Sequence, residues 1–301
     1  MAIILITGGS GLIGSALTER LIQAGHTVRH LSRDPAGAVV PTFKWDVKQG
    51  YLDRSALKGV RHVVHLAGAG IADKRWSRGR IDQLIESRAG SSHLLLQHVL
   101  EAGTSLTSFV TAAGIGYYGA VTSDLYFKED ETPGTDTIAH ISERWEAATD
   151  EWLAICRVVK LRTAVVLAAE GGALPRLSKP VRYGVGAALG TGRQWMPWIH
   201  IHDLVRIYEQ AMFDPAMKGE YNVAAPDQVT NRQFMRTVAQ VLRRPFLLPP
   251  VPAILLRLAL GELSSVLLQG SRVSIDRLVS TGFRFEHPEL PSALKELLLK
   301  R

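Results

Sequence analysis

The chain has 301 residues, of which 46% are hydrophobic and 21% are charged, a balance typical of folded globular proteins and not of disordered ones. The single cysteine, Cys156, excludes an internal disulfide and a cysteine-based metal site, and we expect a cytoplasmic location. The net charge of +7 is compatible with nucleic-acid binding, but no nucleic-acid motif accompanies the basic cluster from Lys74 to Arg80. The sequence therefore predicts no nucleic-acid partner.

Membrane insertion is not predicted either. The apolar run at the N-terminus is too short to span a bilayer and lacks the features of a signal peptide. A second apolar region, from Ala253 to Leu268, is interrupted by Arg257 and Glu262. We interpret that region as buried helices of a globular protein.

The first thirty residues predict a strand, a glycine turn, a helix and a second strand. The run that begins at Ile3 is apolar without interruption, which is typical of a strand buried on both faces. From Ile13 to Ala24 the apolar residues recur at helical spacing, and Thr27 to Leu31 forms the next apolar run.

The turn between them carries three glycines with separate physical roles. Gly8 permits a tight turn, Gly11 lets the backbone approach a diphosphate, and Gly14 allows the helix to pack closely on the strand. The free N–H groups and the dipole of the helix then favour an anion. We assign the diphosphate of a dinucleotide to these residues: Gly8, Ser10, Gly11, Leu12, Ile13 and Gly14.

The end of the second strand indicates which dinucleotide is bound. An NAD site usually has an acidic residue there, whereas this chain has Ser32 followed by Arg33. A hydroxyl and a guanidinium suit a 2′-phosphate, so we predict NADP(H). Two alternatives remain: Asp34 as the acidic residue, although it precedes Pro35 in an expected turn, and Arg33 as a solvated turn residue.

Further strands and helices alternate through the first half of the chain. We expect strands at 43–46, 60–70, 108–111 and 158–167, and helices at 81–100 and 140–154. Asp46 would end its strand near the adenine, and the small residues Leu66-Ala67-Gly68 would let the cofactor lie against backbone. The segment 121–137 is polar and predicts a surface loop.

The second half changes character. Glycines and basic residues dominate 168–192, a strand is expected at 198–201, Asp203 is expected to cap a helix at 204–212, and a short strand at 221–224 precedes helices from Asn231 onward. These elements predict an α/β fold: a doubly wound parallel sheet (Rossmann) with a smaller, mainly helical C-terminal substrate domain. We place the dinucleotide-binding domain at 1–167 with 196–226, and the substrate or lid domain at 168–195 and 227–301.

These motifs resemble the extended short-chain dehydrogenases/reductases, in particular the atypical epimerase-like branch labelled cell-division-inhibitor-like or nucleotide-sugar-epimerase-like. The resemblance rests on several motifs that run nearly end to end: Thr7 to Gly14, Ser32-Arg33, Trp45-Asp46, Leu66-Ala67-Gly68, Gly116-Tyr117-Tyr118-Gly119, Trp145-Glu146, Gly190 to Trp195 and Trp198 to Asp203. It implies that Ser32 and Arg33 hold the 2′-phosphate and that Leu66 and Ala67 line the ribose and diphosphate. It also implies cofactor contacts for Gln83, Arg88 and Val166, and we add Gly68 and Thr111 to this group.

The catalytic residues of that superfamily, Ser-Tyr-x-x-x-Lys, are not matched. Ala113 and Gly114 stand where the second serine is expected, and the helix from His140 to Glu146 has neither the tyrosine nor the lysine. The catalytic residues are therefore unknown, with Thr111, Tyr117 and Tyr118 as candidates.

Aromatic and polar residues before the 198–201 strand are candidates for substrate contact. Arg193, Gln194, Trp195 and Trp198 would form a wall that stacks on and hydrogen-bonds a small-molecule substrate; the alternative is packing between domains. His200 and His202 lack an evident third ligand, so we interpret His200 as structural and predict no metal.

The sequence thus predicts an NADP(H)-binding protein of the short-chain dehydrogenase/reductase type that acts as an oxidoreductase or epimerase on a small molecule. The missing acid–base residues leave a second hypothesis, in which the protein binds NADP(H) without catalysis as a sensor or as an assembly or regulatory protein.

Overall fold

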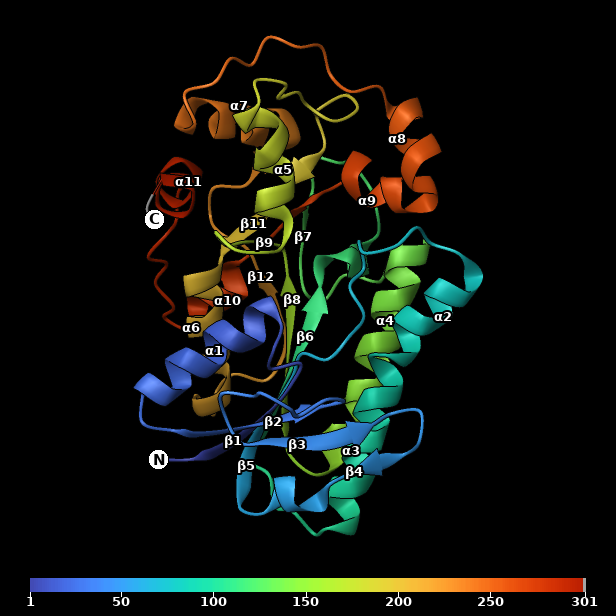
Figure 1. Cartoon of the computed structure of the whole chain (residues 1–301), viewed down its shortest axis with the longest axis vertical. Coiled ribbons are helices and arrows are strands. Elements are labelled where there is room, and N and C mark those ends of the chain that lie inside the picture. The colour runs from blue at the N-terminus through green and yellow to red at the C-terminus, as the bar shows by residue number, and fades with distance from the viewer. Residues whose placement is uncertain (300–301) are drawn as a thin grey trace. The chain divides into compact units, whose positions relative to one another are not determined.

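A central sheet of eight strands dominates the computed structural model, which describes residues 1–299 (Figure 1). The strand order is β12-β8-β6-β5-β1-β2-β3-β4. The strands are β1 (Ile3–Thr7), β2 (Thr27–Ser32), β3 (Thr42–Asp46), β4 (Tyr51–Leu52), β5 (Val60–His65), β6 (Ser108–Gly114), β8 (Arg157–Thr163) and β12 (Gly219–Val223). The pairs β1–β2, β2–β3, β1–β5 and β5–β6 are parallel, and β3–β4 is antiparallel. The predicted α/β fold with a mainly parallel sheet is confirmed.

Strand β1 lies between β2 and β5, with Leu5 opposite Arg29 on one side and Val63 on the other. Its residues Ile4, Leu5 and Ile6 are fully buried. A strand with a neighbour on each side and helices on both faces has no solvent-facing side chains, which explains the uninterrupted apolar run at the N-terminus.

The chain divides into two compact units. The first comprises residues 1–113, 141–161 and 205–220, and the second comprises 114–140, 162–204 and the described residues from 221 onward. The domain boundaries given above, 1–167 with 196–226 and 168–195 with 227–301, stay a prediction.

In the first unit, helices cover both faces of the strands. They are α1 (Leu12–Gln23), α2 (Arg78–Glu86), α3 (Ala89–Glu101), and the parts of α4 (Thr137–Asp150) and α6 (Ile201–Phe213) that belong to this unit; η1 (Arg54–Leu57) and η3 (Glu151–Ala154) are 3-10 turns. Helices α1 and α6 lie on one face, linked by an Arg20–Glu209 ion pair of 2.6 Å (Figure 1). On the other face the Trp152 indole donates to Ser92 of α3 at 2.9 Å. This double covering is the doubly wound arrangement that the alternation of elements predicts.

The single helix expected at 81–100 is two helices, α2 and α3. Their junction is Ser87–Arg88, where the Ser87 hydroxyl accepts a 3.0 Å hydrogen bond from the Ala69 N–H. The break turns Arg88 inward, where it is 5% exposed. The prediction was wrong here because the apolar spacing continues across the break at Ser87–Arg88.

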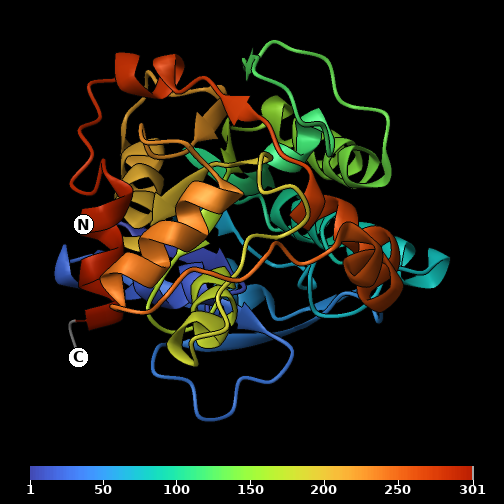
Figure 2. The same cartoon turned by 90° about the horizontal axis from the view of Figure 1, so that it is seen from above.

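In the second unit, small sheets and helices surround a separate core. The strand pairs are β9 (Val165–Leu167) with β11 (Trp198–His200), β10 (Trp195–Met196) with β13 (Val229–Thr230), and β7 (Tyr126–Phe127) with β14 (Arg272–Val273). The helices are α5 (Ala173–Arg182), α7 (Asn231–Val241), α8 (Ala253–Leu260), α9 (Ser264–Leu268), α10 (Asp276–Ser280) and α11 (Leu290–Leu299), with the 3-10 turns η2 (Ile115–Tyr118) and η4 (Gly261–Leu263). Helix α7 packs against both α5 and α11 (Figures 1 and 2).

Two strand predictions change in detail. The strand expected at 158–167 is interrupted at Ala164, whose N–H donates to Val223 at 3.0 Å, so it becomes β8 and β9. The strand expected near 198–201 ends at His200 and pairs with β9 outside the central sheet. The acidic loop expected at 121–137 also contributes the short strand β7.

The apolar region 253–268, expected to be buried, is buried only in part: Leu263 and Ser264 are buried, whereas α8 is not. No residue of α8 is buried, and Ile254, Leu255 and Leu258 are 65%, 55% and 69% exposed. Apolar composition predicted burial, but burial requires a neighbouring element that covers the face. Within residues 1–299, no helix has the length and apolar character that crossing a bilayer requires.

Candidate functional site

The glycine turn between β1 and α1 has the geometry that the spacing predicts. Gly8 has φ +70°, and a Cβ on it would lie 2.8 Å from the Leu66 carbonyl. A Cβ on Gly14 would lie 2.4 Å from the Gly8 oxygen. The Gly11 N–H donates to that same oxygen at 3.0 Å and closes the turn. Side chains are therefore excluded at Gly8 by conformation and at Gly14 by space.

The N-terminus of α1 is open to an anion. Gly11 is the N-cap and supplies no capping side chain, and the first turn holds no acidic residue. The first N–H groups of the helix and the positive end of its dipole are thus unopposed by a negative side chain. Ser10 and Gly11 are exposed, Leu12 and Ile13 are half-buried, and Gly14 is buried. This turn fits a diphosphate.

Ser32 ends β2, the strand adjacent to β1, and Arg33 follows it. The Ser32 hydroxyl bonds the Asp34 backbone, donating to its carbonyl at 2.8 Å. The Asp34 carboxylate accepts from the Ala36 N–H at 3.1 Å, so Asp34 is a turn residue. Arg33 is exposed and has no hydrogen bond or ion pair to any of the residues 1–299. The guanidinium is therefore available for a ligand.

The end of β5 is fixed by a polar network that the sequence analysis missed. The Thr7 hydroxyl oxygen accepts from the Leu66 and Ala67 N–H groups, each at 3.1 Å. The same hydroxyl lies 2.9 Å from His65 Nδ1, to which it donates its own proton. Burial lowers the pKa of His65 to about 4, so the ring is neutral and accepts this proton at Nδ1. Thr7 begins the glycine motif, but nothing in the local sequence distinguishes His65 from an ordinary strand residue.

Two arginines lie buried behind this strand end. Arg80 donates to Gln83 Oε1 at 2.8 Å and to the Gly70 carbonyl at 2.5 Å. Arg88 donates to the Leu84 carbonyl at 3.0 Å, and its guanidinium carbon lies 4.7 Å from the centre of the Trp145 ring. Burial, and then the charge of Arg80, lower the pKa of Arg88 to about 10. Arg88 therefore remains a cation at neutral pH.

Three other residues expected to contact the cofactor, Asp46, Thr111 and Val166, lie in three different strands. Asp46, at the end of β3, accepts from the Lys48 N–H at 2.9 Å and so supports a turn. Thr111 is buried in β6, where its hydroxyl donates to the Ala112 carbonyl at 3.0 Å. Val166 lies in β9 of the second unit, opposite Ile199. The structure thus brings the glycine turn and the 66–68 segment into direct contact, whereas Val166 belongs to the other unit.

The two candidate tyrosines have different surroundings. The buried Tyr118 hydroxyl donates to Asn222 Oδ1 at 2.7 Å and accepts from Arg162 at 3.0 Å. Burial raises the pKa of Tyr118 to about 12. Tyr117 is half-buried, and the Arg162 guanidinium carbon lies 3.6 Å from the centre of its ring. Since the Tyr118 hydroxyl is occupied on both sides, Tyr117 is the better candidate for proton transfer.

The expected substrate wall is only partly accessible. Trp198 is fully buried and donates to the Asp227 carbonyl at 2.6 Å, so we leave it out of the substrate site proposed below. Trp195 is half-buried, with the Arg272 guanidinium carbon 4.3 Å from its ring centre. Arg193 is exposed. Of the two tryptophans, Trp195 alone remains a candidate for substrate contact.

Gln194 lies in the second unit near a cavity that Gly190 and Thr191 of the same loop help to line. Its amide donates to the Leu189 and Leu267 carbonyls at 3.0 and 2.9 Å, which ties the 189–194 loop to α9. The cavity has a volume of about 500 Å³. Its polar lining residues are Thr191, Arg257, Glu262, Ser264, Ser265 and Gln269. Most of these come from the C-terminal helices, whose sequence carries no motif that identifies them.

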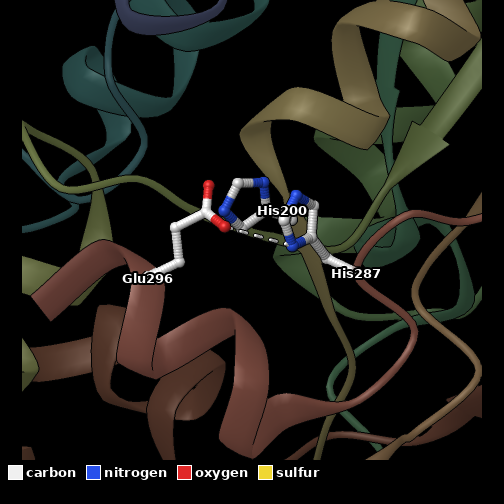
Figure 3. Close-up of side chains that lie close together, drawn as sticks. All are labelled: His200, His287 and Glu296. Atoms are coloured by element: carbon white, nitrogen blue, oxygen red, sulfur yellow. Dashed lines mark ion pairs between the residues drawn. The ribbon is translucent and has the colours of Figure 1, made fainter. Parts of the chain in front are cut away.

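A group of potential metal ligands lies elsewhere in the second unit, in the close-up of Figure 3. His200, His287 and Glu296 each place one ligand atom within 4.8 Å of the others. The two imidazole rings are stacked with centres 3.7 Å apart, and Glu296 lies 3.9 Å from His287 Nδ1. His287 and Glu296 follow His200 by more than eighty residues, so no local sequence pattern links the three.

The hydrogen bonds of His200 indicate helix capping. Its Nδ1 accepts from the His202 N–H at 3.1 Å in the first turn of α6. A neutral ring that accepts at Nδ1 carries its proton at Nε2, which then has no lone pair for a metal. Asp203, expected as the cap, instead accepts from the Glu286 and His287 N–H groups, each at 2.9 Å. The expected cap was therefore wrong: α6 begins at Ile201, and His200 precedes it.

Comparison with known proteins gives two matches along the chain. Residues 4–224 match the sequence profile described as the NAD dependent epimerase/dehydratase family. Residues 251–297 match a domain of unknown function, DUF1731.

Similar proteins align over nearly the whole chain. The chain is 38% identical to epimerase family protein Mb2239 of Mycobacterium bovis, over 97% of this chain and 96% of that protein. It is similar to a crystal structure of human epimerase family protein SDR39U1 (isoform 2) with NADPH, at 31% identity and a TM-score of 0.88, covering 99% of this chain and all of that one. UDP-glucose 4-epimerase of Thermus thermophilus, in complex with NAD, shares the fold at 20% identity and a TM-score of 0.75, over 99% of this chain and 100% of that one.

Proposed function

This chain belongs to the NAD dependent epimerase/dehydratase family, and on that basis we propose that it binds NADP(H) and acts as an oxidoreductase or epimerase on a small molecule. The observation that carries the choice of cofactor is Arg33, whose exposed guanidinium follows the strand next to the glycine turn and has no partner among residues 1–299. The NADPH in the human relative supports the same choice.

The cofactor would be held along the ends of β1, β2 and β5. The glycine turn binds the diphosphate through backbone N–H groups, because the chain there is free of obstructing side chains. Ser32 and Arg33 bind the 2′-phosphate, and Asp46 lies by the adenine. The remaining contacts are assigned to Leu66, Ala67, Gly68, Gln83, Arg88, Thr111 and Val166. When bound, the cofactor supplies or accepts a hydride.

Proton transfer needs residues other than those of the superfamily. A free tyrosine has a pKa of about 10, so its use as a base near pH 7 costs about 4 kcal/mol without help. Thr111 and Tyr117 are the candidates in this chain, since the Tyr118 hydroxyl is occupied by Asn222 and Arg162. The substrate would be a small molecule in contact with Arg193, Gln194 and Trp195.

A non-catalytic NADP(H)-binding protein, such as a sensor or an assembly or regulatory protein, is the second candidate. The first-unit part of α4 favours it, because buried Ile141, Ser142 and Trp145 fill the helix that would otherwise present tyrosine and lysine. Steady oxidation of NADPH with any member of a panel of carbonyl compounds eliminates this candidate. Tight binding without turnover across the panel supports it.

The cofactor assignment is tested by titrating NADPH and NADH into the wild type and two variants. Arg33→Ala should raise the Kd for NADPH about tenfold or more, since a charge-assisted pair is lost, and leave the Kd for NADH nearly unchanged. Arg61 is another exposed arginine, so Arg61→Ala is the matched control and should change neither the Kd for NADPH nor that for NADH. Equal weakening of both dinucleotides by Arg33→Ala refutes the assignment.

A further inference from the structure

One exposed stretch of the second unit combines apolar and basic side chains. It runs from Arg243, just after α7, to Leu258 in α8, and we call it the 243–258 surface (orange in Figure 1). In the loop before α8, Leu247 and Leu248 are 88% and 48% exposed, and in α8 itself no residue is buried. Contiguous exposed apolar side chains of this kind mark an interaction surface, whereas scattered single ones do not.

The exposed apolar residues of α8 share one face of the helix. Ile254 and Leu258 are about one turn apart, and Leu255 lies three residues before Leu258, so the three side chains lie together. Leu256, on the other side, is half-buried, and Arg257 lies at the border of the exposed face. An apolar face edged by a cation is typical of a helix that lies on a membrane surface.

The loop before α8 is constrained. The Val251 N–H donates to the Ala188 carbonyl at 2.8 Å, and the Val251 carbonyl accepts from the Gly190 N–H at 2.9 Å. Four prolines between 245 and 252 restrict its backbone further, and Phe246 packs against the core of this unit. The two exposed leucines of the loop therefore belong to a fixed segment of the surface.

The charge of this part of the chain has one sign. From Gln228 to Gly261 there are five arginines and no acidic residue. Arg243 and Arg244 are exposed, and neither forms an ion pair with a carboxylate among residues 1–299. The next acidic residue, Glu262, accepts a hydrogen bond from the Thr137 hydroxyl. The exposed apolar side chains are thus accompanied by positive charge that this stretch does not neutralise.

This combination fits an anionic lipid surface better than it fits other occupants. In a two-fold contact between copies of the chain the same surface meets itself, so the arginines of both copies would gather and repel one another. A nucleic acid would pair with the arginines but would leave the leucines in water. Anionic headgroups attract arginines, while the boundary below them accepts apolar side chains.

We propose that the 243–258 surface docks the protein on membranes that contain anionic lipids. Ile254, Leu255 and Leu258 enter the boundary between headgroups and acyl chains, and Arg243 and Arg244 contact lipid phosphates. Helix α8 has 8 residues, too few to cross a bilayer, so the contact is peripheral. The proposal goes beyond the proposed function and does not depend on it, because none of these residues is assigned to the cofactor or the substrate.

The test measures binding of the full chain to lipid vesicles by flotation. Vesicles of phosphatidylcholine mixed with phosphatidylglycerol are compared with vesicles of phosphatidylcholine alone. We expect the wild type to bind the anionic vesicles about tenfold or more tightly than the neutral ones, since each arginine near an anionic surface contributes about fivefold. Binding to the anionic vesicles should weaken as the salt concentration is raised, because salt screens the attraction.

The apolar contribution is tested by the double variant Leu255→Ser/Leu258→Ser. Both leucines are more than half exposed, so the variant should fold, which its melting temperature and its titration with NADPH check. Its binding to anionic vesicles should be about tenfold or more weaker than that of the wild type, because two apolar side chains no longer leave water. Leu100→Ser, at an exposed position of α3, is the control and should bind as the wild type does.

The charge contribution is tested by the double variant Arg243→Gln/Arg244→Gln. It should lose about tenfold or more in affinity for the anionic vesicles and should not change in affinity for the neutral ones. Arg61→Gln, at another exposed arginine, is the control for net charge and should lose much less. Arg257 is kept in all variants because it also lines the cavity beside α9.

Four results overturn the proposal. Two are the absence of binding to anionic vesicles and equally tight binding to anionic and neutral vesicles. The third is binding that Leu255→Ser/Leu258→Ser leaves unchanged, which would reduce the contact to general attraction by a chain with a net charge of +7. The fourth is self-association of the wild type that this variant abolishes, which would assign the surface to a second copy of the chain. None of these measurements involves the cofactor, so their failure is distinguishable from failure of the proposed function.

Discussion

The Tyr118 hydroxyl donates a 2.7 Å hydrogen bond to Asn222, a residue 104 positions later in the chain. Arg162 donates to the same hydroxyl at 3.0 Å, so this candidate tyrosine is held by two structural partners. Tyr117, its neighbour in sequence, has Arg162 against its ring face.

Replacement of these two tyrosines should lower the stability of the protein to different degrees. Tyr118→Phe removes the donor to the buried Asn222 Oδ1 and should lower the free energy of unfolding by roughly 1–3 kcal/mol. Tyr117→Phe keeps the ring face that Arg162 contacts and should lower the free energy of unfolding by less than Tyr118→Phe does. Urea denaturation of both variants measures this difference. Equal stability of Tyr118→Phe and the wild type would show that the hydroxyl is not anchored as described.

The stability of the protein should fall in mild acid because of His65. Burial lowers the pKa of His65 to about 4, whereas the unfolded chain takes up this proton near the ordinary value of 6.5. The contribution of the neutral ring is thus complete above about pH 6.5 and is lost as the pH falls toward 4. By pH 4 the loss amounts to about 3 kcal/mol. His62 and His200, whose pKa values are also lowered to about 4, act in the same direction.

Urea denaturation of the wild type and of His65→Gln between pH 4 and pH 8 tests this expectation. The wild-type free energy of unfolding should rise with pH in the window from 4 to 6.5, and His65→Gln should show a shallower slope. Identical slopes would mean that His65 is protonated alike in the folded and unfolded states.

Asp203 should be required for stability because it holds the segment before α11. Its two carboxylate oxygens accept from the Glu286 and His287 N–H groups, and the side chain is fully buried. Asp203→Asn leaves one acceptor oxygen for two N–H groups and should lower the free energy of unfolding by roughly 2 kcal/mol. Asp82→Asn, at an exposed position of α2, is the control and should be neutral. Thermal and urea denaturation measure the stability of the two variants. An equal loss of stability in Asp203→Asn and Asp82→Asn would contradict the role assigned to Asp203.

The exposed face of α8 should tolerate polar residues. Leu258 is 69% exposed, so Leu258→Ser should change the free energy of unfolding by less than about 0.5 kcal/mol. Leu263, only a few positions later, is buried, and Leu263→Ala should cost roughly 2–5 kcal/mol. A large loss in Leu258→Ser would show that another element covers α8 in solution.

The sequence by itself determined the elements that local rules control. Gly8 and Gly14 are recognisable because a turn with positive φ and a close backbone contact each exclude a side chain. The apolar run from Ile3 predicted a central strand because a strand covered on both faces has no polar positions. Ser32 and Arg33 could be placed because their distance from the glycines follows from the order of strand, helix and strand.

Only the tertiary structure decided which distant residues meet. The burial of Arg88 beside Trp145, the bond from Tyr118 to Asn222 and the stack of His200 on His287 join residues far apart in the chain. Apolar composition did not predict the exposure of α8, because burial depends on a neighbouring element and not on the helix itself. Local patterns record the conformation of each segment, whereas charge pairing, hydrogen-bond saturation and burial are properties of contacts that exist only after the chain has folded.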